Sequence, residues 1–157
     1  MALNLTLILR GVQALLAFIV FAMSCYVVSE FRGALSGSPD QPNFMLFNGL
    51  WTAFIALPFL VLAPIYFASF AHIYALLAVE AVTMIFWFAG FIALGAALPA
   101  PKWCHGSVCN SMQAITVFGA FEWLLLVGTL TLAVLPVIRN RGAKSNNPAT
   151  AEVQPGV

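Results

Sequence analysis

The residues with the clearest potential for chemistry are two glutamates, Glu80 and Glu122, set inside long apolar stretches. Sixteen residues separate Glu122 from Arg139, which is about 24 Å of helix at 1.5 Å per residue. That length is shorter than the hydrocarbon core of a bilayer, which is roughly 30 Å thick. If this stretch is a membrane helix, the Glu122 carboxyl lies inside the core. A charge there costs several kcal/mol unless it is paired or protonated.

A carboxyl at such a depth has two ordinary uses. It can couple proton movement in a transporter or channel, or it can act as a polar clasp between helices. We favour the clasp, because transporters usually contain paired repeats and discontinuous helices and this sequence shows neither. Asn48 and Thr52 lie at about the right depth on another apolar stretch to hydrogen-bond Glu122.

Arg10 and Glu80 have matching positions relative to their apolar stretches. About 27 Å of helix separates Glu80 from Leu98, and the stretch from Gly11 to Val28 is equally long. The two charges therefore share a depth, and we expect an Arg10–Glu80 ion pair between helices. The alternative, that each side chain extends separately to the lipid headgroups, is equally open at this stage.

The two neighbouring cysteines Cys104 and Cys109 enclose Gly106 and Ser107, which permit a tight turn. A disulfide between them is predicted if their loop faces an oxidising compartment. The alternative is a pair of inert thiols.

Other catalytic chemistry has no support in the sequence. It holds no phosphate-binding glycine loop and no Cys-x-x-Cys motif, and its two histidines, His72 and His105, are isolated from each other. A metal, haem or other cofactor is therefore not expected. Enzymatic activity is not expected either. The formal net charge of +1 gives no indication of nucleic-acid binding.

The elements that must position these residues are membrane helices. The 157 residues are 62% hydrophobic and 7% charged, against about 25% charged in soluble domains. A membrane helix needs about 20 apolar residues, and the apolar runs predict an all-α bundle of four transmembrane helices over residues 7–28, 44–67, 73–98 and 113–137. The domain spans residues 5–139, and residues 140–157 are predicted to be a disordered cytoplasmic tail.

Lysine and arginine positions indicate the orientation. Both termini of a four-span chain share one side of the membrane, and the basic residues there outnumber those on the opposite side: Arg10, Arg139, Arg141 and Lys144 against Arg32 and Lys102. The termini are therefore predicted to be cytoplasmic, which places the cysteine loop on the non-cytoplasmic side.

The third predicted helix carries two surface features. Ala89, Ala93 and Ala97 recur every four residues and form a small-residue ridge suited to close helix approach. Aromatic residues crowd the same helix and could contact sterol or other lipid, or simply supply apolar bulk; they are Phe86, Trp87, Phe88 and Phe91.

Several segments resemble fungal MARVEL-domain proteins, in matching order. Residues 78–91 (AVEAVTMIFWFAGF) resemble the third helix of that family, the loop with Cys104 and Cys109 resembles the loop that follows, and residues 118–125 (FGAFEWLL) resemble the fourth helix. The first helix fits through Arg10 and Gln13. The resemblance covers residues 5–139, and the proline-rich second helix departs from it most.

The resemblance implies a tetraspan bundle with cytoplasmic termini and no enzymatic activity. It implies a role in organising sterol-rich membrane domains, in membrane apposition or in trafficking, through lateral helix association. The expected partners are membrane lipids, sterol among them, and further copies of this chain or other membrane proteins. The plasma membrane is the expected location, with an internal vesicle membrane as the alternative. A small proton-coupled transporter or channel using Glu122 is the second functional hypothesis.

Overall fold

The computed structural model describes residues 2–34, 37–66, 73–100 and 103–145 of the chain. Its elements are helical: α1 (Ala2–Ala34), α2 (Asp40–Trp51), a π-helical segment η1 (Thr52–Ala56), α3 (Leu57–Tyr66), α4 (Ile73–Ala97) and α5 (Ser107–Ser145). Four stretches are long and apolar enough to cross a membrane, namely Leu5–Gly33, Asp40–Leu62, Ile73–Ala97 and Ser107–Arg139. The predicted all-α fold with four membrane-spanning helices is confirmed.

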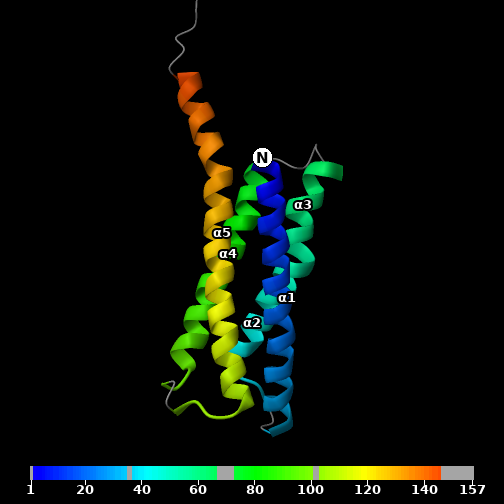
Figure 1. Cartoon of the computed structure of the whole chain (residues 1–157), viewed down its shortest axis with the longest axis vertical. Coiled ribbons are helices and arrows are strands. Elements are labelled where there is room, and N and C mark those ends of the chain that lie inside the picture. The colour runs from blue at the N-terminus through cyan, green and yellow to red at the C-terminus, as the bar shows by residue number, and fades with distance from the viewer. Residues whose placement is uncertain (1, 35–36, 67–72, 101–102, 146–157) are drawn as a thin grey trace, which may run out of the picture.

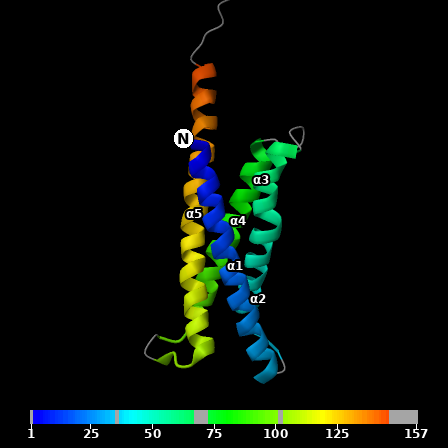
Figure 2. The same cartoon turned by 45° about the vertical axis from the view of Figure 1, so that its right-hand side comes forward.

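The helices stand roughly parallel to one long axis (Figure 1). We call the end of the bundle that holds the chain's N-terminus the terminal end, and the end that holds Cys104 and Cys109 the disulfide end. Chain direction alternates, so α2 and α5 both run from the disulfide end towards the terminal end. α5 projects past the other helices at the terminal end in both views (Figures 1 and 2).

The first and last helices are longer than predicted. α1 continues through Ala34 and takes up part of the expected first loop. α5 begins at Ser107 and runs to Ser145, so a disordered tail from residue 140 is a wrong prediction as far as residue 145. Polar residues outside the apolar core do not by themselves end a helix, because its backbone hydrogen bonds are internal to the helix. Residues 146–157, the rest of the predicted tail, lie outside the described residues.

The second span changes its helical form midway. The N–H of Leu57 donates to the carbonyl of Thr52, five residues earlier, which is a π-helical bond. Pro58 follows directly and has no N–H to donate. A proline disturbs the regular ladder of bonds in the preceding turn, and a π-segment is a common way for a helix to absorb such a disturbance. The span therefore continues as α3 without a loop.

The four spans form a ring in which α1 and α4 each pack against both α2 and α5. α2 and α5 consequently lie diagonally across the bundle. The core contains buried apolar side chains from all four spans: Ala17, Val20, Val27, Met45, Trp87, Leu94, Ile115 and Leu126.

Close approach inside the ring depends on three glycines. A Cβ atom added at Gly49 would lie 2.9 Å from the Ala17 carbonyl oxygen and 2.8 Å from the Phe21 Cβ of α1. A Cβ at Gly90 would lie 2.6 Å from the Met45 Sδ, and one at Gly119 would lie 2.9 Å from the Met45 Cε. Met45 of α2 is therefore accommodated by glycines on both α4 and α5.

The predicted alanine ridge does not take part in this packing. Ala89, Ala93 and Ala97 are all exposed on the outside of α4. Between the helices of one chain, Gly49, Gly90 and Gly119 lie at the close contacts instead, and the role of the ridge in association between chains stays a prediction. The ridge is left on the outer surface of the bundle.

The contact of Gly49 predicts a large effect of one added methyl group. We expect Gly49→Ala to destabilise the folded bundle by about 1–3 kcal/mol, because the new Cβ would overlap the α1 backbone. The measurement is reversible unfolding in mixed micelles. Gly128→Ala is the matched control, since a Cβ there meets open space and alanine favours helix over glycine. Equal stability of the two variants would contradict the close packing of α1 on α2.

Candidate functional site

A buried charged cluster joins three helices near the terminal end. The Arg10 Nη2 lies 2.9 Å from the Glu80 Oε2, and the two side chains are 11% and 3% exposed. The Arg10 Nη1 also donates to the Gln13 Oε1 at 3.0 Å. The structure thus brings together the two residues that share a depth in the sequence, and it places their charges inside the bundle rather than at the headgroups.

Two neutral side chains complete this cluster. The Thr129 hydroxyl of α5 donates to the Glu80 Oε1, and the Gln13 Nε2 of α1 donates to the Thr129 Oγ1 at 3.3 Å. We refer to Arg10, Gln13, Glu80 and Thr129 as the Arg10 cluster. Thr129 was not predicted from the sequence, although its position as a polar residue in an apolar run is a signal that could have identified it.

The hydrogen bonds of the Arg10 cluster determine whether its burial is tolerated. A buried ion pair gains from its mutual attraction only when further hydrogen bonds satisfy its remaining polar atoms. Here Gln13 contacts the guanidinium and Thr129 contacts the carboxylate. The cluster therefore fixes α1, α4 and α5 at one level of the bundle.

A second set of polar contacts joins α2 and η1 to α4. The Trp87 Nε1 donates to the Thr52 Oγ1 at 2.9 Å, and the Trp51 Nε1 donates to the Thr83 Oγ1 at 3.0 Å. The Asn48 Nδ2 donates to the Phe86 carbonyl at 2.9 Å. These donors meet acceptors inside the bundle, which is what a medium without water requires.

The predicted clasp between Glu122 and Asn48 or Thr52 is wrong. Glu122 is fully buried, and neither of its carboxyl oxygens has a hydrogen-bond partner among the described residues. Thr52 accepts from Trp87 instead, and the Asn48 amide group donates to α4. Depth was inferred from helix rise, but a hydrogen bond also needs a free group in the right direction, and the Asn48 amide nitrogen and the Thr52 hydroxyl already have partners on α4.

At the disulfide end the structure joins Cys104 to Cys109, with Cα atoms 5.6 Å apart. Gly106 between them has φ of +97°, a conformation that L residues with side chains rarely adopt. The Tyr26 hydroxyl of α1 donates to the Ser107 Oγ at 2.9 Å, so the turn is also held to the first helix. Cys109 lies in the first turn of α5 and not in a loop.

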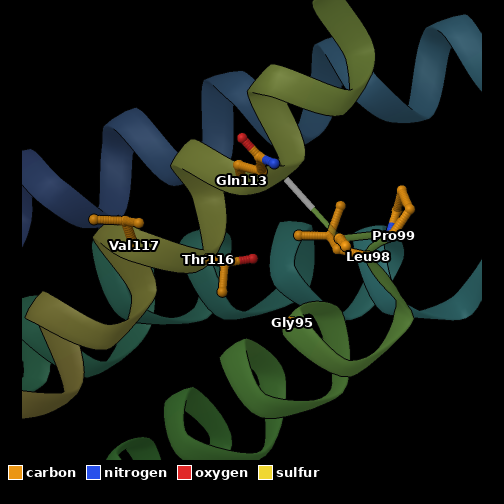
Figure 3. A pocket seen from close by; sticks show the side chains of 7 residues that line it. Gly95, Leu98, Pro99, Gln113, Thr116 and Val117 are labelled. Atoms are coloured by element: carbon orange, nitrogen blue, oxygen red, sulfur yellow. The ribbon is translucent and has the colours of Figure 1, made fainter. Parts of the chain in front are cut away.

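An open groove of about 520 Å³ lies between the end of α4 and the start of α5 (Figure 3). Gln113 and Thr116 of α5 and Gly95 of α4 contribute to its wall, with Leu98, Pro99, Ala100 and Val117. Farther along the same two helices, Trp123 contacts the rings of Phe88 and Phe91 at centroid distances of 5.4 and 6.0 Å. The α4–α5 surface therefore has a partly polar end and an aromatic stretch.

Across the described ranges, no group of three or more His, Cys, Asp or Glu side chains could hold a metal ion. His72 lies outside the described residues, and His105 is exposed in the disulfide turn.

Four apolar spans arranged around buried polar contacts define an integral, multi-pass membrane protein. The chain matches the family model of the MARVEL domain, a membrane-associating domain, over residues 2–132. It therefore belongs to the MARVEL family, as the sequence resemblance indicated. No curated protein and no solved structure matches the chain in the same comparisons.

The Arg10–Glu80 contact predicts strong coupling between two substitutions. We expect Arg10→Met and Glu80→Gln each to destabilise the bundle by about 3–5 kcal/mol, because each leaves an uncompensated charge in the core. The double variant should lose less than the sum of the two, since it buries no net charge. Unfolding in mixed micelles measures the cycle.

The control cycle pairs Glu80→Gln with Arg139→Met, whose arginine is exposed at the terminal end. That pair should be additive. Additivity in the Arg10 cycle as well would remove the ion pair as a determinant of stability.

Proposed function

We propose that this protein is a non-enzymatic organiser of membrane domains that acts by lateral self-association through the exterior of α4. The observation that supports this most directly is the exposure of Ala89, Ala93 and Ala97 along one line of that helix. The ridge is a packing surface that the helices of the chain itself leave unused.

The physics of helix association in lipid favours such a surface. Lipid tails are as apolar as leucine side chains, so bulky apolar residues give helices little reason to associate. Small residues instead let two backbones approach closely enough for extensive van der Waals contact. Ile85 and Ile92, which are 57% and 50% exposed, flank the ridge and would form its walls.

The α4–α5 surface would add contacts to lipid. Its aromatic stretch with Phe88 and Trp123 offers flat apolar faces, and Gln113 at the groove offers a polar group. Sterol has a rigid apolar body and one small polar group, so this surface supports the proposal that the protein gathers in sterol-rich domains. We place it in the plasma membrane with cytoplasmic termini, so that the Cys104–Cys109 bond faces an oxidising compartment.

The ridge makes a specific prediction about association. Replacing Ala89, Ala93 and Ala97 together by leucine should weaken self-association by about tenfold or more, equivalent to roughly 1.4 kcal/mol. The added side chains would hold the two backbones apart. Energy transfer between labelled copies, measured over a range of protein-to-lipid ratios in bilayers, reports the association.

The control carries Ala14→Leu and Ala22→Leu, which add similar bulk to the exposed side of α1. It should associate as the unmodified chain does. Unchanged association of the α4 variant would exclude the ridge from the mechanism.

The lipid part of the proposal predicts a response to sterol. A copy tagged at its C-terminus should form stable patches at the surface of a cell whose membrane contains sterol, and sterol depletion should disperse them. The α4 leucine variant should form fewer patches before depletion. A uniform distribution that does not change on depletion would contradict the role in sterol-rich domains.

A further inference from the structure

Three helices direct polar atoms without partners into the core of the bundle. They are the Ser24 Oγ of α1, the Asn48 Oδ1 of α2 and both carboxyl oxygens of Glu122 of α5, none of which has a hydrogen-bond partner among the described residues. All three residues are fully buried. Buried polar groups in native structures are nearly always hydrogen-bonded to protein or to ordered water, and a group without such a partner calls for an explanation such as a bound ion.

The register of the helices places these atoms close together along the bundle axis. Met45 of α2 meets Gly119 of α5, and these two helices run in the same direction. Asn48 and Glu122 each lie three residues beyond that contact, so they share a depth. Phe21 of α1 meets Gly49, and Ser24 lies three residues nearer the disulfide end. All three side chains fall within about one helical turn, roughly 5 Å.

The oxygen atoms define the chemistry of the site. One carboxylate and two neutral oxygens carry a single negative charge, which must be balanced in a medium where isolated charges are unstable. The Arg10 guanidinium does not provide this balance, because it is paired with Glu80 and hydrogen-bonded to Gln13. We propose that Ser24, Asn48 and Glu122 form an internal binding site for one small monovalent cation, anchored by Glu122.

Either a proton or an alkali metal ion of the size of Na⁺ has the required charge. Both neutralise Glu122, and oxygen ligands suit hard cations. The other charged side chains that the structure describes on the helices around the site lie elsewhere: Glu80 pairs with Arg10, while Glu30, Arg32 and Asp40 lie at the disulfide end and Arg139 at the terminal end.

Buried side chains lie on both sides of the site along the bundle axis. Towards the terminal end lies the Arg10 cluster. Towards the disulfide end lie the buried side chains of Met45, Leu94 and Ile115. Leu94 is also the inner wall of a cavity of about 120 Å³ that Phe31, Gln41 and Met112 line at the disulfide end.

Thermal unfolding of the full chain in detergent tests the proposal. The midpoint is measured from pH 5 to pH 9 in sodium chloride and in choline chloride at equal ionic strength. In choline chloride the midpoint should fall as the pH rises, because loss of the proton leaves a bare carboxylate in the core. Sodium should restore the midpoint at high pH if the site takes an alkali metal ion, and should have no effect if it takes only a proton.

Glu122→Gln, which has nearly the same shape but no charge, should abolish this dependence on pH and sodium. Glu30→Gln, at an exposed position on α1, should retain it. The same pH and sodium dependence in Glu122→Gln and the unmodified chain would overturn the proposal.

A measurement on the unmodified chain covers the case in which Glu122→Gln does not fold. A lipophilic carbodiimide, which adds to protonated carboxyl groups, is applied at pH 6 in choline chloride, and the modified peptide is identified by mass spectrometry. The adduct is expected on Glu122. Modification of other carboxyl groups with none on Glu122 would overturn the proposal. Neither result bears on the alanine ridge, so self-association is tested separately.

Discussion

The buried ion pair between Arg10 and Glu80 constrains how the helices of the bundle are placed relative to one another. Both side chains are withdrawn from water inside the bundle, where an unpaired charge would be strongly unfavourable. Because Arg10 is on α1 and Glu80 on α4, their contact requires these two helices to face each other at one depth. Thr129 adds α5 to the same point. The second span is then held from the other side, by the side-chain donors that link α2 and α4.

Packing of apolar residues adds to the stability that the polar contacts provide. With no hydrophobic drive between helices in lipid, close van der Waals contact carries much of the stability. The bundle obtains it by placing glycines where Met45 and the α1 backbone approach most closely. The alanines of α4 have the same small size but point outward. Small residues therefore lie on two kinds of surface. The glycines are at contacts inside one chain, and the alanines are on its exterior.

The interior and the exterior of the bundle thus offer different kinds of surface. The exterior holds the alanine ridge and the α4–α5 groove, both accessible to other chains or to lipid. The interior holds Ser24, Asn48 and Glu122, whose polar atoms lack partners within the described chain. The Arg10 cluster lies between this internal set and the terminal end. A cation bound at Glu122 would act on the interior of the bundle and not on its outer surface.

The number and type of spans could be predicted from the sequence, because apolar length and sparse charge are properties of each segment alone. The sequence also determined the depth of Arg10 and Glu80, since depth follows from a constant rise per residue. It could not determine which side each helix turns to its neighbours. Asn48 and Thr52 were therefore assigned to Glu122 although they contact α4, and the sequence could not show whether the alanine ridge faces the interior or the exterior of the bundle. Tertiary structure alone decided these points, because helix order and rotation result from the packing of all four spans at once.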